Sequence, residues 1–469
     1  MRRKIYNGLT ICFLILTFFS VFIGEVNAQK PRGSQNKKPS EQAKKLAAQG
    51  DSFYGRKDHR SAAGKYAEAI VAAPVYPYAY FWKGSAHHLL GEYEQAVKDL
   101  SAALEQGHPP IKVYEARWEA HYMMKNYDAA LSDVEAALRI EPSNNYFILA
   151  LANVRRMKGE YQEAINAYNK ALPGSRNSGD IYYFIASSYY NLGEYARQNS
   201  AAAEAVKNST RYTGESYTLM ADAYVKEKKP VEAIAAYERA LNVKPELPQV
   251  YTALASIYES QNRVNDAIAT LRRGIKLYPE NGDMFAALTW YYSLIDRHAE
   301  AVNIGQQAAK LSPNNYAAHT NLCRAYNDTK LYQQAVEACN KALALQANDG
   351  ETYLYLARAH DFQNKPDLAT QYYKKAVSGL LEYTRKNPDS SDGWYLLGNA
   401  FYADGQREKA IEAYKKNLQL SPNFIKGRIN LGYMYFLGNN LSAAREQYDT
   451  LLKIDPPAAE RLKQLMNKK

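Results

Sequence analysis

A small residue recurs along this chain every 34 residues, and this spacing constrains the fold more than any other feature. The period runs through twelve units, with one extra residue at one joint and seven at another. A fixed period of about 20 to 50 residues indicates a repeat protein, in which like units stack on their neighbours. The recurring position is occupied by Ala62, Ala96, Ala130, Ala164, Gln198, Ala233, Ala267, Ala301, Ala335, Ala369, Ala410 and Ala444.

A second schedule follows each of these positions. Seven residues later nine units carry Ala, and five residues after that seven units carry Pro. Two short antiparallel helices approach closely only where small side chains face each other, and larger side chains fill the space beside them. Proline then ends a helix, because it lacks an N–H group and disfavours helical geometry in the preceding residue. The pattern therefore predicts a chain of helix pairs.

The segment WYLLGNAFYADGQREKAIEAYKKNLQLSP, residues 394–422, shows nearly the whole schedule. The segment starts with a large residue that is followed by Leu, Gly and an aromatic residue, and it continues with Ala410, Tyr414 and Pro422. This pattern resembles the tetratricopeptide repeat. Asn417 stands where that family places a second Ala. The resemblance implies an all-α, right-handed superhelical solenoid of about twelve helix-turn-helix repeats, with the first helices lining the concave side. The repeats are predicted to span 43–457, with units starting at 43, 77, 111, 145, 179, 214, 248, 282, 316, 350, 391 and 425.

The N-terminal segment is predicted to direct export. A basic start at residues 2–4 precedes the apolar run 9–24, and Val26-Asn27-Ala28 supplies a small-residue cleavage site. We therefore expect a signal peptide over 1–28 and a periplasmic or secreted protein. The alternative is an uncleaved anchor that tethers the protein to the membrane. Residues 29–42 are polar, basic and proline-containing, and we expect them to form a flexible linker.

Two irregular places are expected to differ from the regular repeats. Seven extra residues before the eleventh unit are close to two helical turns, and they predict that the second helix of unit ten extends through 380–387. The tail 458–469 is amphipathic, with Leu462, Leu465 and Met466 on one stripe. It is expected to form the capping helix that the open end of a solenoid requires, followed by a basic tail.

The net charge of +11 lies mainly at the ends of the chain. Residues 29–45 hold six Lys or Arg and one Glu, residues 461–469 hold four Lys or Arg, and the charges of 46–460 balance. A neutral body with basic ends argues against nucleic-acid binding, and it lets the ends touch an anionic envelope surface. The sequence has no phosphate loop, hydrolase elbow or metal-ligand spacing, so no enzyme activity, cofactor or metal is expected.

Tyrosine is abundant, with 41 copies, and most of it fits the repeat framework. The informative aromatic residues lie on concave phases of the first helices, where the framework does not need them. Such residues predict contacts with a partner. The last two units are expected to form the contact site, with Tyr395, Asn399, Tyr402, Asn430 and Tyr433. Elsewhere the candidates are the concave aromatic residues Trp82, Phe184, Tyr190, Trp290 and Tyr355, and the polar cluster Asn321, Arg324 and Asn327, which is either a peptide-binding group or a solvated helix face.

The two cysteines that follow the predicted signal peptide are Cys323 and Cys339, on facing positions of the two helices of unit nine. Export would place them where disulfides persist, so a bridge is one interpretation. The other is that both are small packing residues.

These observations favour a non-catalytic scaffold that binds peptide or protein segments on its concave face in the cell envelope. One alternative is a structural spacer or assembly factor of an envelope complex, which makes its contacts through the convex face or the basic ends. A second is an accessory to glycan or cell-wall processing, because aromatic rings can stack on sugars. The sequence indicates no oligomeric state.

Overall fold

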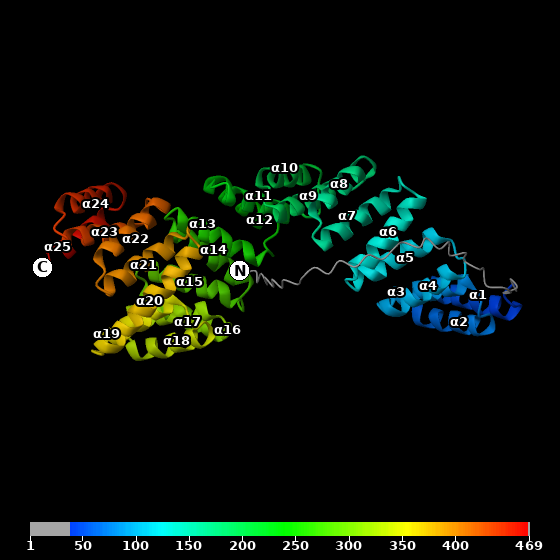
Figure 1. Cartoon of the computed structure of the whole chain (residues 1–469), viewed down its shortest axis with the longest axis horizontal. Coiled ribbons are helices and arrows are strands. Elements are labelled where there is room, and N and C mark those ends of the chain that lie inside the picture. The colour runs from blue at the N-terminus through cyan, green and yellow to red at the C-terminus, as the bar shows by residue number, and fades with distance from the viewer. Residues whose placement is uncertain (1–37, 468–469) are drawn as a thin grey trace, which may run out of the picture. The chain divides into compact units, whose positions relative to one another are not determined.

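The computed structural model describes residues 38–467, and within them the chain forms 25 α-helices, one short 3-10 helix and no strand (Figure 1). This confirms the all-α class and the succession of helix pairs expected from the sequence. The odd-numbered helices α1 to α23 are the first helices of twelve pairs, the even-numbered α2 to α24 are the second helices, and α25 follows the last pair. The helices are α1 (Glu41–Gly55), α2 (His59–Ala72), α3 (Pro77–Leu89), α4 (Tyr93–Glu105), α5 (Pro110–Met123), α6 (Tyr127–Ile140), α7 (Asn145–Lys158), α8 (Tyr161–Ala171), α9 (Ser178–Leu192), α10 (Tyr195–Lys207), α11 (Thr213–Lys226), α12 (Pro230–Val243), α13 (Pro248–Ser260), α14 (Val264–Leu277), α15 (Gly282–Leu294), α16 (His298–Leu311), α17 (Tyr316–Asp328), α18 (Tyr332–Leu345), α19 (Gly350–Phe362), α20 (Pro366–Lys386), α21 (Ser391–Ala403), α22 (Arg407–Leu420), α23 (Ile425–Leu437), α24 (Leu441–Ile454) and α25 (Pro456–Asn467).

The chain divides into two compact units. Unit 1, Met1–Ile140, contains the described helices α1–α6, and unit 2, Glu141–Lys469, contains α7–α25. Within each unit the two helices of a pair pack against each other, and the second helix also packs against the first helix of the next pair. Pairs one to three therefore form one stack and pairs four to twelve form another.

The helix boundaries lie close to the expected unit starts. Eleven of the twelve first helices begin within one residue of the expected position. The exception is α1, which begins two residues early, so that residues 41 and 42 of the expected linker are helical. The reason is the N-cap Ser40, whose side chain accepts a hydrogen bond from the Ala43 amide. The expected signal peptide 1–28 and the linker residues before 38 lie outside the described part of the chain.

The turn inside each pair has one residue in the left-handed backbone region. This backbone geometry closes the turn. In four pairs the residue is Gly, which adopts positive φ without steric cost. In eight pairs a Lys, Asn or Asp adopts it instead; Asp296, for example, has φ 61°. The twelve residues are Lys57, Gly91, Lys125, Gly159, Gly193, Lys228, Asn262, Asp296, Lys330, Asn364, Gly405 and Asn439.

The recurring small position lies in the core of every pair. All eleven alanines and Gln198 are at most 2% exposed, which confirms the packing interpretation of the period. Gln198 is accommodated because its side-chain amide donates to the Leu219 carbonyl oxygen at 2.6 Å. Close approach is sharpest at Gly398, where an added Cβ would lie 2.5 Å from the ring of Tyr414.

In four pairs the same hydrogen bond joins the two helices beside the buried small residue. A tyrosine of the second helix donates its hydroxyl to an Asp or Asn that lies 15 residues earlier, directly after the small residue of the first helix. The polar bond is thus placed at the edge of the buried contact, where both partners are satisfied. The donor and acceptor pairs are Tyr66 and Asp51, Tyr168 and Asn153, Tyr237 and Asp222, and Tyr414 and Asn399.

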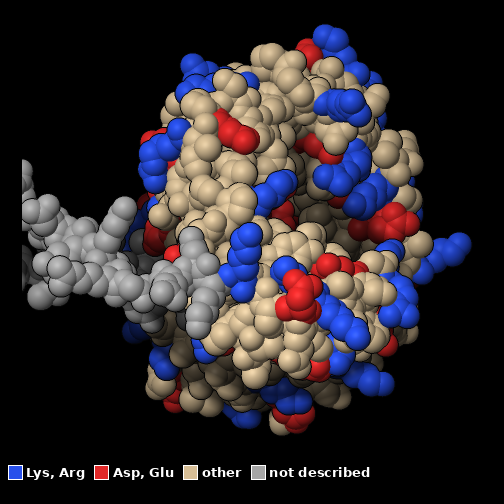
Figure 2. All heavy atoms as spheres, turned by 90° about the vertical axis from the view of Figure 1, so that its right-hand side faces the viewer, with Lys and Arg blue, Asp and Glu red and all other residues tan. Residues whose placement is uncertain are grey.

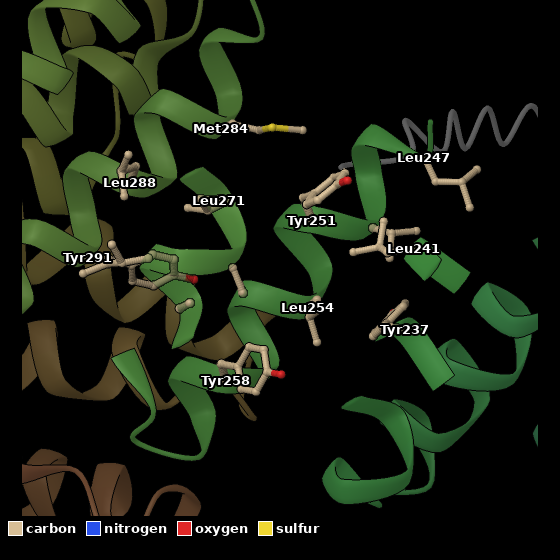
Figure 3. Packing of buried hydrophobic residues seen from close by; sticks show 14 of the residues in the cluster. Tyr237, Leu241, Leu247, Tyr251, Leu254, Tyr258, Leu271, Met284, Leu288 and Tyr291 are labelled. Carbon is tan, nitrogen blue, oxygen red and sulfur yellow. The ribbon is translucent and has the colours of Figure 1, made fainter. Parts of the chain in front are cut away.

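The apolar core of unit 2 is continuous along the stack. One large cluster of buried residues runs from α11 to α17, and Figure 3 shows its tyrosine and leucine side chains filling the space between successive helices. A second runs from α17 to α23. Because each cluster draws on several pairs, stability is shared between neighbours as in other repeat proteins.

The two irregular places behave as expected. Helix α20 has 21 residues, against 13 or 14 in the other helices of pairs nine to twelve, which confirms the lengthened second helix. Helix α25 starts two residues earlier than predicted and buries Leu462 in a cluster that Leu465 and Met466 also join, which confirms the cap. No helix of the described residues has the length and apolar character to cross a membrane.

Candidate functional site

The predicted contact residues fall into separate places. In unit 1, Trp82 on α3 is half-buried and its ring contacts those of Tyr54, Tyr78 and Phe81, with centroids 5.0, 6.1 and 5.3 Å away. Trp82 is therefore part of an aromatic cluster of its own unit. The other candidates are in unit 2.

Helix α9 carries two of the predicted aromatic residues, and they differ. Phe184 is half-buried, stacks on Tyr168 at 5.9 Å and has the Arg156 guanidinium 5.0 Å from its ring centroid. Tyr190 is 44% exposed. Of these two predicted contact residues, Tyr190 is therefore the accessible one.

Arg324 on α17 lies at the centre of a group of inward-facing residues. Its guanidinium carbon lies 3.9 Å from the ring centroid of Trp290 on α15 and 5.9 Å from that of Tyr355 on α19. Arg324 is only 6% exposed, and Asp328 lies 3.9 Å from its Nε. A cation held over aromatic rings in this way is stabilised by the ring quadrupole. The burial of Arg324 contradicts the alternative of a solvated helix face, and its contact with a peptide stays a prediction.

The asparagines beside Arg324 join neighbouring helices. Asn321 donates to the Ala286 carbonyl oxygen of α15 at 2.9 Å, and Asn327 donates to the Tyr355 carbonyl oxygen of α19 at 3.1 Å. Asn327 is 2% exposed. First helices approach closely enough here for side-chain amides to bind the adjacent backbone, and the contact of these amides with a peptide stays a prediction.

Three carboxyl groups complete this interior, and sequence reasoning did not single them out. Glu259 on α13 accepts a hydrogen bond from Trp290 Nε1 at 2.9 Å. Burial, with the nearby charge of Asp392, raises the pKa of Glu259 to about 7, and burial also raises the pKa of Asp392. Burial and the charge of Asp349 raise the pKa of Glu351 to about 7. Glu351 and Asp392 both occupy the second position of their units, and these units are consecutive. This shared position was the sequence signal from which two neighbouring acidic side chains could have been predicted.

We call this group the inner cluster. Tyr395 belongs to it rather than to an open face, because its ring is half-buried and lies 5.0 Å from Phe424 and 6.2 Å from Tyr414. The inner cluster comprises Glu259, Trp290, Arg324, Glu351, Tyr355, Asp392 and Tyr395.

The remaining predicted residues form an accessible surface on α21 and α23, the C-terminal ridge, defined by Asn399, Tyr402, Asn430 and Tyr433. Tyr402 is 44% exposed, and burial, with a smaller effect of Tyr433, raises the pKa of its hydroxyl. Tyr433 is half-buried and stacks on Phe436 at 6.5 Å.

Hydrogen bonds fix the amide of Asn399 within this ridge. Its Oδ1 accepts from the Tyr414 hydroxyl at 2.7 Å and from Asn430 Nδ2 at 2.9 Å. Both bonds use the oxygen, and the NH₂ group of Asn399 is left to donate, with the Tyr395 hydroxyl as its partner in the protein. The ridge thus combines an oriented donor with an exposed aromatic ring.

Cys323 on α17 and Cys339 on α18 are joined in a disulfide, with their Cα atoms 5.3 Å apart. The bridge links the two helices of pair nine beside Arg324. Within the described residues, no group of three or more His, Cys, Asp or Glu side chains is arranged to hold a metal ion.

Charged side chains of both signs are interspersed on the surface that Figure 2 shows. Lys and Arg lie next to Asp and Glu on this face. Ion pairs of unit 1 include Arg60 with Glu92 and Lys112 with Glu115. This mixture agrees with the balanced charge of the body of the chain.

Comparison with known proteins finds repeats of one kind. Three models described as tetratricopeptide repeat match residues 224–291, residues 391–424, and residues 47–109, 119–180 and 295–351, together more than half of the chain. The UDP-N-acetylglucosamine--peptide N-acetylglucosaminyltransferase of Giardia intestinalis is 31% identical over 81 residues, which are 17% of this chain. The small glutamine-rich tetratricopeptide repeat-containing protein 2 of Saccharomyces cerevisiae is 40% identical over 62 residues, which are 13% of this chain.

The chain spans only a small part of these relatives, 6% of the first and 18% of the second. Among solved structures, the yeast Tom70 crystal structure is 14% identical with a TM-score of 0.38, covering 91% of this chain and 94% of that one.

Proposed function

Because the chain belongs to the tetratricopeptide repeat family, we propose that it is a protein-interaction scaffold and that it binds a partner segment on the C-terminal ridge. The observation that carries the choice of site is the state of Asn399. Its oxygen is held by two donors of the protein itself, which orients its NH₂ group; one N–H of that group serves Tyr395, and the other can donate to a ligand. The other predicted amides, Asn321 and Asn327, already bind backbone carbonyls.

The ridge suits an extended segment of protein. The NH₂ group of Asn399 can donate to a backbone carbonyl of the segment, and Tyr402 offers a rigid ring against which an apolar side chain can be buried. A hydrogen bond made by an oriented donor adds specificity, because little side-chain entropy remains to be lost on binding. The ridge residues carry no charge, so the segment is expected to be recognised through its backbone and apolar side chains.

The proposed scaffold is non-catalytic and acts outside the cytoplasm. Every folded segment of the described residues is a helix pair, the single 3-10 turn or α25, which leaves no place there for a separate catalytic domain. The location is inferred from the sequence of residues 1–28 alone, which has the pattern of an export signal. Either a periplasmic or secreted protein or a membrane-tethered one agrees with that pattern.

The proposal is tested by changing one atom group of the ridge. Asn399→Asp keeps an oxygen that accepts from Tyr414 and Asn430, and it replaces the NH₂ donor, which also contacts Tyr395, with an acceptor. The fold accepts Asp at this position, because Asp51 and Asp222 accept the corresponding tyrosine bonds in pairs one and six. With the donor lost and a carboxylate facing a carbonyl, capture of the partner from an envelope extract of the source organism should fall about tenfold or more.

Asn153→Asp is the matched control, since Asn153 accepts the same bond from Tyr168 in pair four. Tyr402→Ala and Tyr190→Ala form a second matched pair, because both tyrosines are 44% exposed. We expect Asn399→Asp and Tyr402→Ala to lose the same partner by mass spectrometry while both controls retain it. Equal capture by all four variants would exclude the ridge and favour a spacer that uses other surfaces.

A further inference from the structure

A contact between distant parts of unit 2 is made by three charged side chains. Asp296 lies in the turn after α15, Lys426 is the second residue of α23, and Arg461 is on α25. Lys426 Nζ lies 3.1 Å from Asp296 Oδ1 and donates to the Ser293 carbonyl oxygen at 3.3 Å. Arg461 Nη1 lies 3.1 Å from Asp296 Oδ2. These partners are 130 and 165 residues apart in the sequence, so pair eight returns to contact pair twelve and the cap.

The same two parts of the chain meet around poorly filled space. A cavity of about 300 Å³ is lined by Asp296, Lys426 and Arg461 together with Glu259 and Phe424. A second cavity of about 510 Å³ lies between the C-terminal end of α13 and the segments before α21 and α23, with Glu259 and Asp392 in its wall. Space of this size between polar groups is large enough to hold water.

Neither of the two large buried clusters of the described residues spans this contact. The buried cluster that includes α13 and α15 ends at α17, and the cluster that includes α21 and α23 begins at α17. Each successive pair in between is joined to the next through buried apolar side chains. The return contact is made by partly exposed ion pairs and by apolar side chains, such as Ile295 and Phe424, that line the cavity. Ion pairs of this kind contribute little and are screened by salt, so the return contact is the weakest junction of this part of unit 2.

The contact lies beside the inner cluster. Glu259 lines both cavities and binds Trp290, whose ring carries Arg324. In the closed arrangement Arg324 Nη1 and Glu351 Oε1 are buried without a hydrogen-bond partner among the described residues. Buried polar atoms without partners are costly, and they would be satisfied by water or by a ligand once the contact opened.

We propose that Asp296, Lys426 and Arg461 form a polar clasp that closes this part of unit 2 over the inner cluster and opens to admit a partner segment. Opening separates the turn after α15 from α23 and α25 and leaves every successive helix contact intact. It uncovers Trp290, Arg324 and Tyr355 and so lengthens the binding surface that starts at the ridge. The admission of a segment rests on the proposed function, whereas the opening itself is a property of the unliganded protein and is tested without a partner.

The test compares side-chain exposure by hydroxyl-radical footprinting of the full chain. Asp296→Asn removes the charge and keeps a residue that tolerates the left-handed turn conformation. Losing two partly exposed ion pairs should shift the closed-to-open ratio about fivefold. We therefore expect oxidation of Trp290 and Tyr355 to rise by up to that factor. Sodium chloride at about 0.5 M, which shortens the screening length to a few Å, should produce the same rise in the wild type but not in Asp296→Asn.

Glu300→Gln is the matched control, because it removes the exposed pair between Arg297 and Glu300 one turn away without touching α23 or α25. Oxidation of Trp82 in unit 1 should stay constant in every sample. If Asp296→Asn disturbs the turn itself, the double variant Lys426→Gln, Arg461→Gln tests the clasp from the other side.

Two results decide the proposal. Footprints of Asp296→Asn and of the double variant that equal those of the wild type and Glu300→Gln, at low and high salt, would overturn it. Increased exposure with unchanged capture of a partner would retain the clasp and reject its role in admission, independently of the Asn399→Asp test of the ridge.

Discussion

The buried carboxyl group of Glu259 predicts that unit 2 loses stability as the pH rises. A free glutamate has a pKa of 4.5, and burial beside Asp392 raises the pKa of Glu259 to about 7. The folded protein therefore holds this proton more tightly than the unfolded chain, so the stabilising effect is complete below about pH 4.5 and is lost as the pH rises to about 7. The difference of the two pKa values corresponds to at most about 3 kcal/mol.

The perturbation is Glu259→Gln, which keeps an oxygen to accept from Trp290 and cannot ionise. We expect its free energy of unfolding to match the wild type near pH 5 and to exceed it near pH 8 by up to about 3 kcal/mol, measured by urea unfolding with circular dichroism and tryptophan fluorescence. Glu232→Gln, at an exposed position of α12, is the control and should follow the wild type throughout. Parallel pH profiles for the wild type and Glu259→Gln would refute the reasoning.

Two further predictions concern packing and the disulfide. Gly398→Ala should destabilise unit 2 by about 1 to 3 kcal/mol, because the new Cβ meets the Tyr414 ring at 2.5 Å. Gly64→Ala in α2 is the control: its Cβ would have no atom within 4 Å, so it should stabilise unit 1 by about 0.5 to 1 kcal/mol. A gain in stability at both positions, measured by urea unfolding, would contradict the packing argument. Reduction of the bridge between Cys323 and Cys339, which are 16 residues apart, should lower the local free energy of unfolding of pair nine by about 3 kcal/mol, seen as faster amide exchange in α17 and α18. Unchanged exchange there, with faster exchange elsewhere, would show that the bridge does not stabilise this pair.

Much of the fold follows from local rules that a single sequence displays. The small residue, the large residues beside it and the proline repeat at one spacing, so the position of each pair can be counted along the chain. Gln198 shows why the rule tolerates an exception, since its amide finds a carbonyl oxygen in the next pair. The length of α20 followed from the number of extra residues, because whole helical turns keep the same face buried.

The site was less predictable because it depends on contacts between pairs. Asn321, Asn327 and Asn399 all lie on first helices and look equivalent in sequence, yet Asn321 and Asn327 donate to the backbone of neighbouring helices, whereas the oxygen of Asn399 accepts from the hydroxyl of a second-helix tyrosine. The burial of Arg324 depends on Trp290 one pair earlier and Tyr355 one pair later.

The clasp is the least predictable element. Asp296, Lys426 and Arg461 meet only because the stack returns on itself after several pairs, and that return is set by small rotations between neighbouring pairs. No local pattern at these three positions indicates their contact.

The most direct test of the account is to replace Tyr402 with a photoreactive phenylalanine and to irradiate the protein in an envelope extract of the source organism. The control carries the same group at Leu441, an exposed residue on the second helix of the same pair as Tyr433. If the C-terminal ridge binds the partner segment, one protein should crosslink at position 402 and not at 441. A partner that crosslinks at 441 and not at 402 would contradict the account and place the interaction on α24.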